Sequence, residues 1–143
     1  MVTKWDLAHM DTARRYAQLS TARRAQVGCV LVKDNRIISI GYNGMPSGWD
    51  NNCEDEVAVF DGCVELKTKP EVLHAEANAI TKVARSPENC DGATLYTTML
   101  PCLDCAKLIY QSGIKEVFYS EQYPKGTAGL DFLKKCNIPV SKI

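Results

Sequence analysis

Three residues with zinc-binding side chains, and a carboxylate next to one of them, are the chemically distinctive feature of this sequence. His74-Ala75-Glu76 is followed along the chain by Pro101-Cys102-Leu103-Asp104-Cys105. One imidazole and two thiolates leave one position of a tetrahedral zinc ion free, whereas a structural zinc site is closed by four protein ligands. The pattern therefore predicts a catalytic zinc site with His74, Cys102 and Cys105 as ligands, and Glu76 as a carboxylate that is not a ligand.

This H-x-E and P-C-x-x-C pair resembles the signature of the zinc nucleobase deaminases. Zinc in such a site lowers the pKa of bound water to about 7, so hydroxide becomes available at neutral pH. To release ammonia from an aminopyrimidine, hydroxide must attack C4 while protons reach N3 and the departing amine. Glu76 can take the first proton and return it, as a general base and then a general acid.

Two predicted helices must position these groups. Residues 71–84 form a dense apolar pattern after Pro70 and predict a buried helix, with His74 and Glu76 in its first turns. Pro101 precedes a second predicted helix over residues 103–111, which places Cys102 and Cys105 about one turn apart at a helix start. The positive end of a helix favours thiolate over thiol. Alone, the two cysteines could be a redox pair, and His74 could be an ordinary buried histidine. The combination of the H-x-E and P-C-x-x-C motifs favours a catalytic zinc site instead.

The remaining periodicity predicts a three-layer α/β domain with one mixed, five-stranded sheet. An amphipathic helix is expected over residues 5–19 and a hairpin over 26–32 and 36–42. Residues 43–70 are polar and show little regular pattern, so we expect a functional insert there. Further strands are expected over 94–98, 116–120 and 139–141, and a short helix over 126–136.

Composition limits the function classes. The 143 residues predict a single domain over 1–143, and 45% hydrophobic with 24% charged residues is typical of a globular protein. With 17 basic and 17 acidic residues the formal charge is zero, which argues against binding polymeric nucleic acid. No apolar run predicts a membrane span or signal peptide, and seven cysteines, an odd number, fit a reducing compartment. We expect a cytoplasmic protein that does not bind membranes.

Beyond the zinc motifs, the chain resembles the deoxycytidylate deaminase family of the cytidine deaminase-like superfamily over nearly its whole length. The resemblance rests on residues 41–48, 74–80, Tyr96, 101–106 and 111–115. It implies hydrolytic conversion of dCMP to dUMP, the precursor of thymidylate, with one catalytic Zn²⁺ per chain. It also implies a homo-oligomer, a hexamer, activated by dCTP and inhibited by dTTP, with Mg²⁺ accompanying the bound effector.

The resemblance also implies roles for individual residues. His74, Cys102 and Cys105 become the zinc ligands and Glu76 the proton shuttle. Six further residues are implied to contact the substrate: Asn43, Tyr123, Ser20, Arg23, Arg24 and Ala75. The arginine guanidinium groups suit a 5′-phosphate, and the asparagine amide suits the sugar. An effector site is implied at Gly44, Pro46, Gly48 and Arg85, where glycines would let backbone N–H groups approach phosphates.

Some family members bind a second, structural zinc, and this sequence departs from their pattern. Val72 stands where the acidic ligand is expected, and no histidine lies between His9 and His74. Cys53, Cys63 and His9 could form another ligand set for a second zinc, but their spacing is irregular. We therefore expect one zinc per chain. Three other functions stay open: a free cytidine or deoxycytidine deaminase, a tRNA adenosine deaminase, and a non-catalytic zinc-binding interaction module, which would need a fourth protein ligand.

Overall fold

A mixed five-stranded sheet forms the centre of the protein, in a computed structural model that describes residues 1–143. The strand order is β2 (Arg36–Tyr42), β1 (Gly28–Lys33), β5 (Thr94–Met99), β6 (Glu116–Glu121) and β7 (Val140–Lys142). β1 runs antiparallel to β2 and β5, while β5, β6 and β7 run parallel. The parallel half brings the carboxyl ends of β5 and β6 to one edge, where ligands bind in open α/β sheets.

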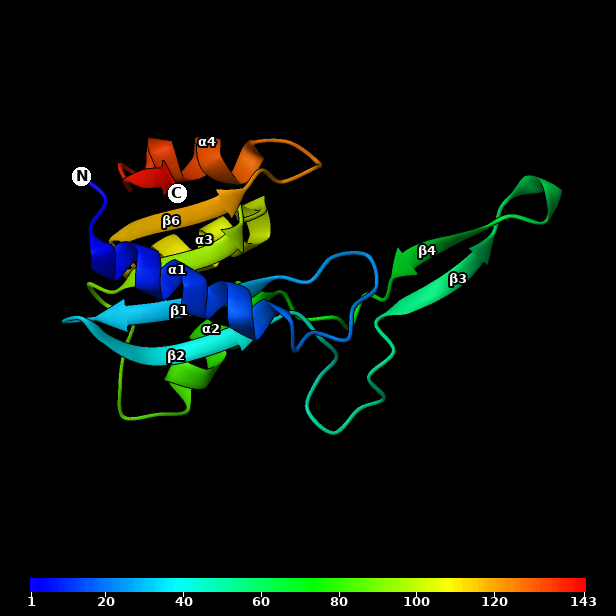
Figure 1. Ribbon diagram of the computed structural model, residues 1–143, viewed down its shortest axis with the longest axis horizontal. Helices are drawn as coiled ribbons and strands as arrows, with labels where there is room; N and C mark the ends of the chain where they lie inside the picture. The colour runs from blue at the N-terminus through cyan, green and yellow to red at the C-terminus, as the bar shows by residue number, and fades with distance from the viewer.

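Helices cover both faces of this sheet (Figure 1). α1 (Lys4–Ala17) packs Met10 and Ala13 onto one face. α2 (Ala75–Ala84), α3 (Leu103–Gln111) and α4 (Ala128–Lys135) share the larger core on the other face. The predicted three-layer α/β/α architecture with a mixed five-stranded sheet is therefore confirmed. No helix is both long and apolar enough to cross a membrane.

A second, separate pair of strands extends from this body as an arm (Figure 1). β3 (Glu54–Ala58) pairs antiparallel with β4 (Val64–Thr68), and a short 3₁₀ turn, η1 (Phe60–Gly62), joins them. The expectation of little regular structure over residues 43–70 is wrong for this part. Both strands are mostly exposed, so their sequences need no strongly apolar face. The alternation that normally identifies a strand is absent from β3 and short in β4, which reads Val-Glu-Leu-Lys-Thr.

The start of α2 also differs from its prediction. The helix begins at Ala75 and not at residue 71, because Leu73 is held in an extended bridge to Gly44. His74 is consequently the residue that caps the helix. The other body helices and strands lie within about two residues of their predicted bounds, as is usual for element ends.

α2 lies close to β2 because glycine occupies the contact point. A Cβ at Gly41 would collide with the carbonyl oxygen of Ala75 and the backbone nitrogen of Ala79. The absence of that side chain lets the first turn of α2 approach the sheet. Ala75 and Ala79 are fully buried there, so the helix that begins after His74 is anchored in the main core.

Candidate active site

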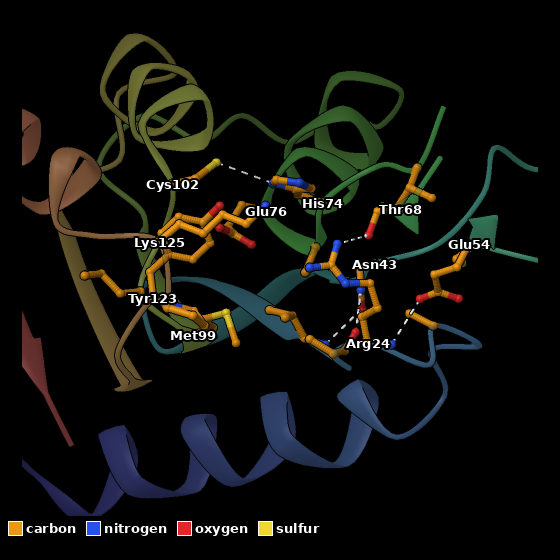
Figure 2. Close-up of a pocket in the computed structure, with 18 residues that line it drawn as sticks. Arg24, Asn43, Glu54, Thr68, His74, Glu76, Met99, Cys102, Tyr123 and Lys125 are labelled. Atoms are coloured by element: carbon orange, nitrogen blue, oxygen red, sulfur yellow. Dashed lines mark hydrogen bonds between the residues drawn. The ribbon is translucent and has the colours of Figure 1, made fainter. Parts of the chain in front are cut away.

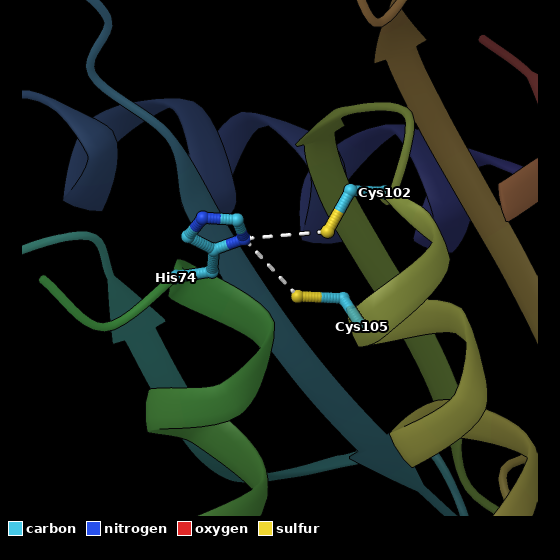
Figure 3. A group of neighbouring side chains, drawn as sticks. All are labelled: His74, Cys102 and Cys105. Carbon is cyan, nitrogen blue, oxygen red and sulfur yellow. Dashed lines mark hydrogen bonds between the residues drawn. The ribbon is translucent and has the colours of Figure 1, made fainter. Parts of the chain in front are cut away.

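The three predicted metal ligands meet between two helix starts (Figure 3). His74 caps α2, Cys102 caps α3, and neither side chain makes a capping hydrogen bond. His74 Nδ1 lies 3.4 Å from Cys102 Sγ and 3.3 Å from Cys105 Sγ, and all three candidate ligand atoms lie within 4.8 Å of one another. The capping positions therefore leave both side chains free to turn toward a shared centre.

These donors fit a zinc ion. Zn–N and Zn–S bonds of ordinary length place nitrogen and sulfur about 3.6 Å apart in a tetrahedral site, close to the separations found here. Hydrogen bonding from Cys105 lowers the pKa of Cys102 to about 4, while the same contact raises the pKa of Cys105. One thiolate is thus favoured by the protein alone, and the two helix N-termini add positive potential around it. The set supplies three ligands and leaves one position open.

Glu76 lies in the first turn of α2 with its side chain in the same pocket as His74 and Cys102 (Figure 2). It is 4% exposed, and burial raises the pKa of its carboxyl to about 7. A carboxyl with such a pKa exchanges a proton readily at neutral pH. Its place beside the ligands suits a group that moves protons between water and a substrate.

The pocket has a volume of about 280 Å³, and its walls come from segments that are distant in the sequence. Ala75 and Glu76 lie beside the metal ligands, and Met99, Leu100, Tyr123, Pro124 and Lys125 come from the carboxyl ends of β5 and β6. Opposite walls come from the segment before β1, the end of β2 and the base of the β3–β4 hairpin: Ala22, Arg24, Ala25, Val27, Asn43, Cys53, Glu54 and Thr68. The pocket is thus lined by both regular elements and loops.

Asn43 is fixed at the pocket by hydrogen bonds to the backbone. Its Oδ1 accepts from Val27 N at 2.9 Å, and its Nδ2 donates to Ala25 O at 2.8 Å. The carboxamide retains one N–H and one lone pair for a ligand. Ser20 Oγ donates to the Asn43 carbonyl at 2.7 Å and does not line the pocket, so it supports Asn43 from behind.

The two neighbouring arginines point in different directions. Arg24 lines the pocket, and its Nη1 donates to Thr68 Oγ1 at 3.1 Å (Figure 2). Arg23 is not among the lining residues. Its guanidinium pairs with Glu54 and Glu56 of β3, each at 3.5 Å. Of the two arginines singled out from the sequence, the structure brings only Arg24 to the site.

Lys125, Glu54 and Thr68 are pocket residues that the sequence reasoning did not select. Lys125 follows Tyr123 and Pro124 in the turn after β6, and a turn at the carboxyl end of a parallel strand is a place where ligands bind. That position could have identified Lys125. Glu54 and Thr68 gave no comparable signal, because they reach the pocket only through the unpredicted hairpin.

The residues assigned to an effector lie in two separate places. Gly44 pairs with Leu73 next to His74, and Gly48 has a positive φ of 85° within the loop that follows. A Cβ at either glycine would meet nothing within 4 Å. Arg85 is exposed at the other end of α2, and a ten-residue helix spans about 15 Å. One chain therefore does not bring Arg85 and the glycine segment together.

The candidates for a second zinc site are also separated. His9 is on α1, with Nε2 3.2 Å from Asn35 Oδ1. Cys53 is buried, with its sulfur 3.6 Å from the Thr21 hydroxyl, whereas Cys63 is exposed on the hairpin. The group formed by His74, Cys102 and Cys105 is the one set of three metal-binding side chains in the structure.

The fold and site together define a zinc-dependent hydrolase with a pocket for a small molecule. The model of the cytidine and deoxycytidylate deaminase zinc-binding region matches residues 3–121, so the chain belongs to this family and is an enzyme. Human deoxycytidylate deaminase is 42% identical over 125 residues, 84% of this chain and 67% of that protein. The phage T4 deoxycytidylate deaminase is 37% identical over 153 aligned residues, 82% of this chain and 79% of that protein.

A solved structure is similar over the whole chain. The dCMP deaminase of cyanophage S-TIM5, in complex with dCMP and dUMP, superposes with a TM-score of 0.88 at 40% identity and covers 100% of this chain and 99% of that one. This agreement confirms the predicted family and the predicted fold. The His-Cys-Cys cluster supports the catalytic zinc expected in this zinc-binding family.

Proposed function

We propose that this enzyme hydrolytically deaminates dCMP to dUMP and ammonia, and so supplies the precursor of thymidylate. The observation that carries the proposal is one pocket whose lining includes Glu76 and the two metal ligands His74 and Cys102. Two cationic side chains, Arg24 and Lys125, line the same pocket. The cationic groups suit a substrate with a phosphate, and Asn43 suits its sugar. The similarity to deoxycytidylate deaminases supports the same substrate.

The chain's own groups account for the proton transfers. Zinc held by His74, Cys102 and Cys105 supplies a Lewis acid that makes water nucleophilic at neutral pH. The Glu76 carboxylate takes a proton from the attacking water and delivers it to N3 of the cytosine ring as the C4–O bond forms. Glu76 then carries the second proton from the new hydroxyl to the amino group, so that the C4–N bond breaks and ammonia leaves.

Substrate selection depends on groups away from C4. Arg24 and Lys125 bind the 5′-phosphate, Asn43 holds a sugar hydroxyl, and Tyr123, half-buried, contacts the base or sugar with its ring. Ala75 offers a backbone N–H from the first turn of α2, where no intrahelical acceptor exists. In this assignment Arg23 and Ser20 support the site and do not touch the substrate.

The proposal includes regulation and assembly. The enzyme would be a cytoplasmic hexamer, activated by dCTP and inhibited by dTTP. Each effector would bind with Mg²⁺ at the segment that contains Gly44, Pro46 and Gly48. Support comes from the two hydrogen bonds between Gly44 and Leu73, at 3.1 and 2.8 Å, which link this segment to the residue before His74. Because Arg85 lies at the far end of α2, one effector could contact both places only across two chains.

A substrate panel tests this function. Purified, zinc-loaded protein is incubated with dCMP, deoxycytidine, CMP, dCTP and an adenosine-containing RNA, and base absorbance and released ammonia are followed. Two charge-assisted hydrogen bonds, if additive, predict kcat/KM for dCMP about 10²- to 10⁴-fold above deoxycytidine. Equal values would contradict the substrate assignment. A sigmoidal dCMP curve that becomes hyperbolic with dCTP supports the regulation, and a curve indifferent to dCTP and dTTP contradicts it.

A further inference from the structure

The β3–β4 hairpin contributes to the pocket through its base. Glu54 is the first residue of β3 and Thr68 the last residue of β4, and the two are paired across the strands. Both line the pocket that contains Glu76 and Arg24 (Figure 2). The rest of the hairpin projects away from the body (Figure 1), so its direct influence on the site must pass through this pair.

Glu54 is a buried carboxylate that interacts with the backbone of the neighbouring arginines. It is 1% exposed, and its Oε2 accepts from the N–H groups of Arg23 at 2.9 Å and Arg24 at 3.1 Å. Its Oε1 has no hydrogen-bond partner but lies 3.5 Å from Arg23 Nε. A buried carboxylate is costly without such compensation, so this pairing fixes both the carboxylate and the chain that carries Arg24.

Thr68 holds the other end of the same arginine. Its hydroxyl accepts from Arg24 Nη1 at 3.1 Å, so the hairpin base fixes Arg24 both at its backbone and at its guanidinium. Arg23 is directed to Glu54, Glu56 and Asn52 and balances the negative charge of the hairpin base. Because Arg23 pairs with the Glu54 carboxylate, the guanidinium of Arg24 is not drawn into an ion pair with Glu54. It stays available to the pocket.

We infer that Glu54 and Thr68 are positioning residues that hold Arg24 toward the 5′-phosphate, and that the hairpin base thereby sets the preference for a nucleotide over a nucleoside. The inference rests on the proposed function. An arginine side chain loses considerable rotamer freedom when it binds, and holding it in place beforehand reduces that loss. Neither residue acts on the reacting atoms, so their effect must appear in phosphate recognition and not in the chemical step.

Kinetics of Glu54→Gln and Thr68→Val on dCMP and deoxycytidine test the inference. We expect the ratio of kcat/KM values, dCMP over deoxycytidine, to fall roughly 10-fold in each variant, because small displacements of a binding group have large kinetic effects. The change should lie in KM for dCMP, with kcat and both constants for deoxycytidine retained. In an Arg24→Ala background, adding Glu54→Gln should change the ratio no further, since the two residues act as a unit.

Glu65→Gln is the matched control, because it removes one negative charge from an exposed position on the same hairpin and should leave the ratio unchanged. Thermal unfolding and zinc content establish that each variant is folded. If Glu54→Gln does not fold, Thr68→Val carries the test, because it removes only the acceptor for Arg24. Equal losses on both substrates, or an unchanged ratio in folded variants, would overturn the inference alone. A wild-type ratio near one would overturn the substrate proposal and the inference together.

Discussion

Two walls of the pocket are supported by different kinds of structure. The metal-ligand wall, His74, Glu76 and Cys102, is attached to the starts of α2 and α3, whose following turns are buried in the main core. The arginine wall, Arg24, Glu54 and Thr68, joins a loop to the base of an exposed hairpin, and its hydrogen bonds link residues 30 and 44 positions apart. Local helix geometry thus positions the metal ligands and Glu76, whereas long-range side-chain contacts position Arg24, the group that selects the substrate.

The largest expected effect comes from breaking the metal-ligand wall at its ligands. Cys102→Ser or Cys105→Ser replaces a soft anionic ligand with a poor neutral one, so the single zinc per chain should be lost with all deaminase activity. Metal analysis and turnover of both dCMP and deoxycytidine measure this. Cys63→Ser, at an exposed hairpin position, is the control and should keep its zinc. Two zinc ions per wild-type chain would contradict the assignment of one.

Glu76→Gln tests the same wall without removing the metal. An amide cannot take up and return a proton, so kcat should fall by about 10²- to 10⁴-fold or more while zinc content stays at one per chain. The loss should be equal for dCMP and deoxycytidine, because Glu76 acts at the base and not at the phosphate. Near-normal turnover of either substrate would remove Glu76 from its assigned role.

The difference between the two walls also explains what the sequence could predict. The metal-ligand wall is encoded over short distances: the H-x-E and P-C-x-x-C spacings, together with helix start signals, predict its geometry from neighbouring residues. The body strands and helices were predictable for the same reason, since each buries an apolar face that leaves a periodic pattern. Even the error at the start of α2 came from a long-range contact, the pairing of Leu73 with Gly44.

The arginine wall could not be predicted in this way. β3 and β4 pair with each other and not with the main sheet. Glu54–Ala58 therefore carries no alternation of buried and exposed residues, and Val64–Thr68 alternates only weakly, with no fully buried residue. Arg23 and Arg24 look equivalent in the sequence. Only the position of Glu54 decides that Arg23 balances a buried carboxylate and Arg24 reaches the pocket.

Substituting the two arginines one at a time tests this division. Arg24→Ala should lower kcat/KM for dCMP by about 10- to 10²-fold, as for one charge-assisted hydrogen bond, and leave deoxycytidine almost unaffected. Arg23→Ala should instead lower the thermal unfolding midpoint, because Glu54 loses its cationic partner, with a smaller and indirect change in selectivity. Parallel kinetics and thermal unfolding separate the two. A larger loss of dCMP selectivity in Arg23→Ala than in Arg24→Ala would contradict this assignment of the two arginines.

The smallest effect expected is on the packing behind the metal-ligand wall. Gly129, in the first turn of α4, faces the start of α3: a Cβ there would collide with the carbonyl oxygen of Pro101 and lie 2.9 Å from the carbonyl carbon of Cys102. Gly129→Ala should therefore cost about 1–3 kcal/mol of folding stability by overpacking. The backbone that carries Cys102 must shift to make room, so zinc affinity should also decrease.

Gly92→Ala provides the comparison for that substitution. Gly92 has a positive φ of 75° and open space around it, so alanine there should lower stability through backbone strain, at the opposite end of β5 from the metal. Thermal unfolding with competitive zinc chelation distinguishes the two variants. Both should be less stable than wild type, but only Gly129→Ala should bind zinc more weakly, and its ratio of dCMP to deoxycytidine activity should not change. Lys125 lies in the turn just before α4, so a changed ratio in Gly129→Ala would mean that the shift also reaches the phosphate-binding side of the pocket.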